Sequence, residues 1–187
     1  MEMTATGFGP SLAGRRDEEF AEFVSTRSGW LRKVAYLLTG DWHRADDLAQ
    51  ATVTKLYVRW HRLGGVENVD GYARQTLVNS FLAERRSPWA RVLLGRGENG
   101  GDGPPPVVPQ PDLDAVLDLR RALAELPPRQ RATVVLRYFC DLTVEQTAET
   151  LGCTPGTVKS QTARGLDALR RVLTPDSEPT ATGGGTS

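Results

Sequence analysis

Apolar residues recur every three or four positions in two stretches of the chain, and the stretch between them lacks this pattern. In the first stretch, residues 20–38 place apolar side chains near one face of a helix that should end at Thr39 and Gly40. A second helix follows, with a clear amphipathic stripe over about four turns. Its positions are Ala45, Leu48, Ala49, Thr52, Val53, Leu56, Tyr57 and Trp60.

A third helix is predicted after the loop that runs from Gly64 to Asp70. Its inward positions, at the same spacing, are Tyr72, Ala73, Thr76, Leu77, Ser80 and Phe81. Three helices with short connections indicate a small helical bundle.

The segment between the two patterned stretches reads SPWARVLLGRGENGGDGPPPVVPQP. Glycine and proline prevent a continuous helix here and leave little apolar surface to pack, so residues 87–111 are predicted to be a flexible linker. Residues 1–16 and 175–187 have the small, polar composition of disordered ends.

The second patterned stretch opens with a helix predicted over residues 112–126, which Pro127 and Pro128 end. A helix over residues 129–139 and two shorter helices should follow. The predicted fold class is therefore all-α, with two small helical domains, residues 17–86 and 112–174, joined by the Gly/Pro-rich linker.

The last two predicted helices have the residue types of a DNA-binding helix-turn-helix. Thr143 can cap the first of them, and Gln146 would complete a capping box. Gly152 stands where that helix must end in a left-handed residue, which glycine adopts without a Cβ penalty. Thr154 and Pro155 are typical of the cap and first position of the second helix.

The second of these helices divides into an apolar face and a polar face. The positions predicted to be buried are Val158, Gly165, Leu166, Leu169, Val172 and Leu173. The candidates for contact with bases and phosphates in the major groove are Thr157, Lys159, Ser160, Ala163 and Arg164, with Gly156 beside them. An ordinary solvated helix face would carry similar residues, so the pattern alone leaves both interpretations open.

Charge, hydropathy and cysteine spacing limit the kinds of protein that this chain can be. Lys and Arg number 23, as do Asp and Glu, and this neutral balance is unusual for a protein that binds DNA alone. No apolar run approaches the roughly 20 residues that span a bilayer, and no signal-peptide pattern is present, so a cytoplasmic location without membrane insertion is expected. Cys140 and Cys153 lack the spacing of a disulfide framework or zinc site.

Two runs near the N-terminus, DWHRADDLAQATVTKLYVRWHRL and ENVDGYARQTLVNSFLAERR, resemble region 2 of the extracytoplasmic-function (ECF) sigma factors of bacterial RNA polymerase. Residues 123–173 resemble region 4 of the same family. The combination covers most of the chain apart from the linker and tails. It implies a non-enzymatic sigma factor that binds core polymerase and directs promoter-specific transcription initiation at −10 and −35 elements.

The resemblance also implies roles for individual residues. In that family the helix with an Asp-Asp-Leu-x-Gln pattern binds the clamp helices of the largest polymerase subunit, which assigns Asp46, Asp47 and Gln50 to this contact. Many relatives have an acidic residue after the glutamine, where this chain has Ala51. The two aspartates would also suit the positive end of a helix dipole without any partner.

The resemblance assigns recognition of the −10 element to the third helix and to the loop before it, where the family captures a flipped base of the promoter. The candidate residues are Asn68, Asn79, Arg74, Arg85 and Arg86. Trp60, Tyr72 and Trp89 are nearby aromatic residues, expected to be core residues rather than stacking platforms.

Region 4 of the family also contacts the flap of the second-largest polymerase subunit, and an anti-sigma factor that clamps the two domains is a further hypothesis. A subunit carried to DNA by a large partner gains effective concentration, which reconciles the neutral charge with DNA binding.

Two other classes of function remain to be compared. A dimeric helix-turn-helix regulator would read two half-sites about one helical turn apart, with the first bundle as its dimerisation domain. An enzyme has little support, because His43 and His61 lack partners at metal-ligand spacing and no phosphate-binding glycine loop appears. No cofactor and no catalytic or metal-binding residue is predicted.

Overall fold

The computed structural model describes residues 12–63, 68–86 and 113–174, and it divides the chain into two units, residues 1–105 and 106–187. The predicted linker and C-terminal tail, together with Trp89, lie outside the described residues. Every regular element in the described ranges is a helix, which confirms the predicted all-α class. Each unit is treated below on its own.

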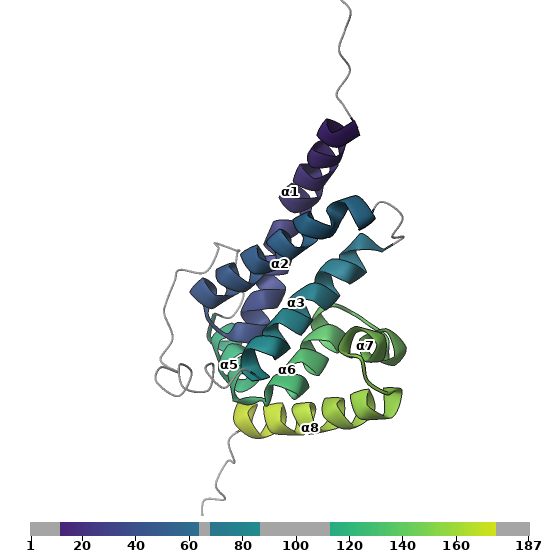
Figure 1. The fold of residues 1–187 in the computed structure, drawn as a ribbon. Coiled ribbons are helices and arrows are strands. Elements are labelled where there is room, and N and C mark those ends of the chain that lie inside the picture. Colours follow the sequence, from purple (N-terminus) through teal and green to yellow (C-terminus); the bar gives the residue numbers. More distant parts are fainter. Residues whose placement is uncertain (1–11, 64–67, 87–112, 175–187) are drawn as a thin grey trace, which may run out of the picture. The chain divides into compact units, whose positions relative to one another are not determined.

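The first unit is a bundle of α1 (Leu12–Thr39), α2 (Trp42–Leu63) and α3 (Val69–Arg86) (Figure 1). Helix α1 packs along α2, and α3 packs mainly against α2. The fully buried side chains include Leu31, Val34, Leu38, Leu48, Leu56, Leu77, Val78 and Phe81. Apart from the adjacent pair Leu77 and Val78, these positions lie three, four, seven or eight residues apart within each helix, so the apolar stripes meet in one core.

Local chemistry sets the boundary between α1 and α2. Gly40 has a φ of 76°, the left-handed conformation that ends a helix, as predicted. The carboxylate of Asp41 then accepts a hydrogen bond from the Arg44 backbone N–H at 2.8 Å and caps α2.

Two expectations for the first unit were wrong. Helix α1 begins at Leu12, so residues 12–16 belong to a helix rather than to a disordered end. Tyr57 was placed in the buried stripe of α2, but it is 54% exposed. Apolar spacing identifies one side of a helix, and only the neighbouring helices decide how wide a band of that side is covered.

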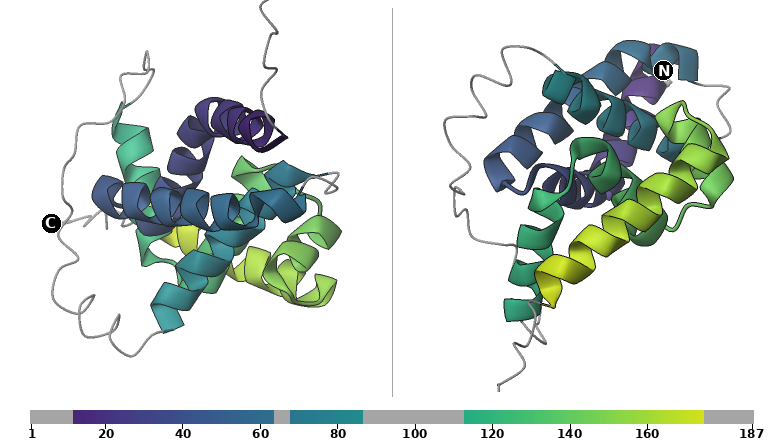
Figure 2. Two further views of the ribbon diagram at one scale, coloured as in Figure 1. Left: turned by 45° about the horizontal axis from the view of Figure 1, so that its top comes forward. Right: turned by 90° about the horizontal axis from the view of Figure 1, so that it is seen from below.

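The second unit contains α5 (Leu113–Glu125), α6 (Pro128–Val134), α7 (Val144–Leu151) and α8 (Pro155–Leu173). Helix α8 contacts the other three (Figure 2). At Gly165 it passes so close to α6 that an added Cβ would lie 2.7 Å from Val134 Cγ2. Glycine is therefore required here for its small volume.

Arg131 holds the start of this unit together from within the core. It is only 4% exposed, and its Nη2 donates to the backbone oxygens of Ala124 and Leu126 at the end of α5. Ala124 lies in the last turn of α5 and Leu126 just beyond it, where backbone oxygens lack a partner within the helix, so the guanidinium replaces water as their donor.

Three details of the second unit differ from expectation. The helix predicted over residues 129–139 is α6 followed by a π-helical turn, Val135–Phe139, closed by the bond from Cys140 N to Val135 O at 3.0 Å. Helix α8 has 19 residues and is not short. Val172 and Leu173, predicted to be buried, are 43% and 44% exposed, because the stripe continues into a last turn that its neighbours leave partly uncovered.

In the described parts of the chain, no helix is both long and apolar enough to cross a membrane.

Candidate functional site

The helix-turn-helix has the caps that the sequence predicts. Thr143 Oγ1 accepts from Gln146 N at 3.1 Å, and Gln146 Oε1 accepts from Thr143 N at 2.9 Å, which completes the capping box. Gly152 has a φ of 59° and ends α7 in the left-handed region. Thr154 Oγ1 accepts from Thr157 N at 3.2 Å at the start of α8. These bonds fix where α8 begins and how it leaves the turn.

The N-terminal half of α8 presents a polar face to solvent. Lys159, Ser160, Ala163 and Arg164 are all exposed, while Val158 is fully buried beneath them. Neither Lys159 nor Arg164 takes part in an ion pair within the described ranges, so both cations are available to a partner. The helix N-terminus adds partial positive charge to the same end.

Thr157 differs from the other candidates on α8. Its side chain is half-buried, and its hydroxyl lies 2.9 Å from the hydroxyl of the cap residue Thr154. Ser160 Oγ donates to the backbone oxygen of Thr157 at 2.9 Å and keeps its lone pairs for another donor.

The structure divides the candidate residues of α3 between two faces. Asn79 and Arg86 are exposed and lie seven positions apart, which is about two helical turns and the same face. Arg74 and Arg85 are half-buried on another face, where their guanidinium groups lie 5.6 Å from the rings of Trp30 and Phe81. These residues therefore do not form one continuous patch.

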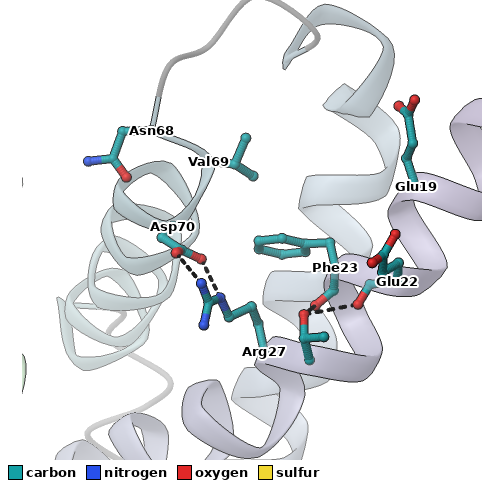
Figure 3. A pocket seen from close by; sticks show the side chains of 8 residues that line it. Glu19, Glu22, Phe23, Arg27, Asn68, Val69 and Asp70 are labelled. Atoms are coloured by element: carbon teal, nitrogen blue, oxygen red, sulfur yellow. Dashed lines mark hydrogen bonds and ion pairs between the residues drawn. The ribbon is translucent and has the colours of Figure 1, made fainter.

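Asn68 stands at the start of α3, where its Oδ1 accepts from Gly71 N at 2.7 Å. It caps the helix, and its amide nitrogen stays available as a donor. Asn68 also lines a pocket of about 410 Å³ between α1 and the first residues of α3, together with Phe23 and Val69 (Figure 3). A bidentate pair from Arg27 to Asp70, at 2.9 and 2.8 Å, joins the two helices beside this pocket.

Asn79 lines a second groove, of about 610 Å³, between α2 and α3. Two cations that the sequence reasoning missed lie in it: Lys55 Nζ donates to Ser80 Oγ at 2.8 Å, and Arg59 Nη1 donates to Tyr72 Oη at 2.7 Å. The Tyr72 hydroxyl raises the pKa of Arg59 above its ordinary value through this hydrogen bond. Their spacing of four residues beside the apolar stripe of α2 was the available signal.

The aromatic residues near these grooves serve mainly as packing. Trp60 is half-buried, with its ring centroid 5.0 Å from Phe20 and 5.4 Å from Phe23. This agrees with the expectation that Trp60 is a core residue, and the distances are those of favourable aromatic pairs.

The three acidic and amide candidates on α2 differ in their surroundings. Asp46 is bound by Arg32 of α1 through two parallel hydrogen bonds, from Nε to Oδ1 and from Nη2 to Oδ2. The hydrogen bonds from Arg32 lower the pKa of the Asp46 carboxyl below its ordinary value, against a smaller opposing effect of burial. Asp47 and Gln50 are exposed, and no other described side chain binds theirs.

The described residues contain no group of three His, Cys, Asp or Glu side chains that could hold a metal ion. His43 and His61 are exposed, and His61 Nε2 accepts from Arg62 Nε at 3.2 Å. Cys140 and Cys153 are half-buried thiols.

Comparison with known proteins matches both units to one family. The Sigma-70 region 2 family model matches residues 23–91, and the Sigma-70, region 4 model matches residues 117–169. The chain is 32% identical over 162 residues to the RNA polymerase sigma-E factor of Streptomyces coelicolor, which covers 83% of this chain and 86% of that protein. It is 34% identical over 169 residues to the ECF sigma factor SigE of Mycolicibacterium smegmatis, covering 86% of this chain and 63% of that protein.

Solved structures show the same fold. The sigma factor RpoE of Bartonella quintana, crystallised with the anti-sigma factor NepR, superposes with a TM-score of 0.70 over 85% of this chain and 99% of that chain, at 24% identity. CnrH, solved with the cytosolic domain of CnrY, has a TM-score of 0.57 over 86% of this chain and 91% of that chain, at 19% identity.

A stand-alone dimeric regulator needs no region 2 bundle ahead of its helix-turn-helix. The presence of both regions therefore does not favour that alternative. With both regions matched in this order and relatives similar over most of its length, the chain belongs to the sigma-70 family, among the extracytoplasmic-function RNA polymerase sigma factors.

Proposed function

We propose that the two helical units divide the work of a sigma factor, which binds core RNA polymerase and directs it to promoters. The unit of residues 17–86 holds the polymerase and the −10 element, and the unit of residues 112–174 reads the −35 element. The observation that carries this proposal is the exposed, unpaired cationic face at the capped start of α8. Such a face on the second helix of a helix-turn-helix fits the major groove.

Within the −35 surface, Lys159 and Arg164 would bind guanine edges or phosphates, and Ser160 a phosphate. Ala163 permits close approach or touches a thymine methyl. Thr157 has a hydroxyl already paired with Thr154, so its contribution is to hold the start of α8 and to offer its remaining lone pair.

For the −10 element, the split faces of α3 suggest two kinds of contact. Asn79 and Arg86 lie on the exposed face, and the groove beside Asn79 carries the cations Lys55 and Arg59. Arg74 and Arg85 lie at the edge of the bundle, where a long side chain can still reach a phosphate. Asn68 lines the pocket with Phe23, where an extruded base would meet an aromatic ring.

The proposed polymerase surface lies on the first half of α2, with Asp47 and Gln50 exposed and Asp46 at its edge. This surface of α2 would contact the clamp helices of the largest polymerase subunit. The second unit would contact the flap of the second-largest subunit. A chain with 23 basic and 23 acidic residues does not need strong DNA affinity of its own when polymerase delivers it. We expect no catalytic activity and a cytoplasmic location.

The recognition helix is tested by in vitro transcription with core polymerase on a promoter that needs its −35 element and on one that does not. Lys159→Ala and Arg164→Ala should each lower transcription about tenfold at the first promoter only, since one base or phosphate contact is worth about 1–3 kcal/mol. Asn79→Ala should lower transcription at both promoters. Arg171→Ala, which removes a cation from the last turn of the same helix, is the matched control. Equal losses at both promoters for Lys159→Ala would contradict the assignment.

The sigma factor RpoE, which has a similar fold, was solved with the anti-sigma factor NepR, and we propose that this chain also has such an inhibitor. The protein purified from its own cells should then co-elute in a stoichiometric complex that does not bind core polymerase. Free protein that is constitutively active in those cells would argue against an inhibitor.

A further inference from the structure

Four side chains form a cluster where α1 and α2 meet. The Arg32 guanidinium donates hydrogen bonds to both carboxylate oxygens of Asp46, and the distance from Nη2 to Oδ2 is 2.9 Å. The same guanidinium lies 4.6 Å from the centroid of the Trp42 ring. Trp42 in turn stacks on Tyr36 at 3.8 Å with an angle of 9° between the rings. We call these four residues the Arg32 cluster.

The cluster fixes the first turns of α2 against α1. Trp42 is the first residue of α2 and is only 7% exposed, and Asp46 lies one turn further along the helix. A planar guanidinium that binds a carboxylate at its edge and an aromatic ring at its face defines both position and rotation. Helix α2 therefore cannot turn about its axis without breaking the cluster.

The geometry separates Asp46 from its neighbour. Both Asp46 oxygens already accept bonds from Arg32, whereas Asp47 and Gln50 carry exposed side chains three positions apart on one face of α2. A carboxylate that is bound at both oxygens has less to offer a second partner. An unpaired one keeps its full capacity.

We propose that Arg32 is a positioning residue for polymerase binding: through Asp46 and Trp42 it sets the rotation of α2 that presents Asp47 and Gln50, and Asp46 acts on Arg32 and not on polymerase. This inference rests on the proposed polymerase surface. It differs from the family resemblance, which assigns Asp46 and Asp47 the same role.

A double-mutant cycle on the full-length protein tests the inference by its affinity for core polymerase. Arg32→Gln and Asp46→Asn should each weaken binding by about fivefold, and the double variant should be no weaker than either one, because both break one interaction. The charge swap Arg32→Asp with Asp46→Arg should restore affinity to within about twofold of the original. Asp47→Asn should weaken binding by at least as much. Because Arg32 acts in part by presenting Asp47, Arg32→Gln should cost less affinity in the Asp47→Asn background than in the unaltered protein.

The carboxyl pKa of Asp46, followed by NMR, supplies a readout independent of polymerase. The Arg32 hydrogen bonds hold this pKa below its ordinary value of 3.8, with a smaller contribution from His43. In Arg32→Gln the pKa should rise toward that value, while in Asp47→Asn it should stay low.

Multiplying losses for Arg32→Gln and Asp46→Asn, or a folded swap variant with no recovery, would show that Asp46 contacts polymerase directly. If the swap variant does not fold, the neutral pair Arg32→Gln with Asp46→Asn decides the question alone. A failure of the proposed polymerase surface can be told apart from a failure of this inference. If that surface is wrong, Asp47→Asn and Gln50→Ala bind core polymerase as tightly as the unaltered protein does, whatever result the double-mutant cycle gives.

Discussion

Replacing Arg131 by methionine is expected to lower the free energy of unfolding of the second unit by about 2–4 kcal/mol, because the hydrogen bonds of a charged donor are worth about 1.5–3 kcal/mol when buried and less where the acceptor is partly exposed. Methionine can fill the volume of the arginine stem, but it leaves the Ala124 and Leu126 oxygens at the end of α5 without this donor. A unit of this size has a stability of about 3–9 kcal/mol in all. The substitution should therefore remove a large share of it.

The positions of the tryptophans make this loss measurable in the intact chain. Trp30, Trp42, Trp60 and Trp89 all precede residue 106, so tryptophan fluorescence reports on the first unit while far-UV circular dichroism reports on helices of both. In urea, Arg131→Met should shift a dichroism transition to lower concentration and leave the fluorescence midpoint in place.

Arg129→Met is the matched control, because Arg129 is an exposed arginine two residues earlier in the same helix. Its unfolding free energy should change by less than about 0.5 kcal/mol. An Arg131→Met protein as stable as this control would mean that the buried guanidinium does not stabilise the end of α5.

Reversing the charge of Asp47 is expected to abolish function at every promoter. In Asp47→Lys, an exposed carboxylate on the proposed polymerase surface becomes a cation, and an unfavourable charge at an interface costs several kcal/mol. The affinity for core polymerase should fall about 100-fold or more. Both the unfolding curve and the tryptophan fluorescence should stay unchanged, since no described side chain binds Asp47.

The promoter dependence distinguishes this variant from those of α8. Asp47→Lys should reduce transcription equally with and without a −35 element, and excess protein should partly restore it, because the defect lies in assembly. Glu18→Lys makes the same charge change at an exposed position of α1 and serves as the control. Normal core binding by Asp47→Lys would remove this residue from the polymerase surface.

The features that the sequence predicted correctly depend on contacts between residues close in the chain. The capping box of Thr143 and Gln146 spans three residues, and the left-handed Gly152 follows from its own lack of a side chain. The same is true of the cap at Thr154 and of the helix end at Gly40. Because these interactions close within one helical turn, residue type and spacing are sufficient to predict them.

The features that the sequence did not predict join residues far apart in the chain. Arg32 meets Asp46 across 14 positions, and Lys55 meets Ser80 across 25. Likewise, Asn79 is exposed and Arg74 is half-buried because of which side of α3 the other helices cover. A spacing pattern states that a helix has two faces, but it does not state which neighbour lies against them.

The sequence by itself therefore determined the helices, their caps and the helix-turn-helix, since short-range hydrogen bonds and apolar periodicity specify these. Only the tertiary structure decided that Asp46 is held by Arg32, that Arg131 is buried and that Tyr57 is exposed. The physical reason is that burial and ion pairing are set by the packing of whole helices against one another.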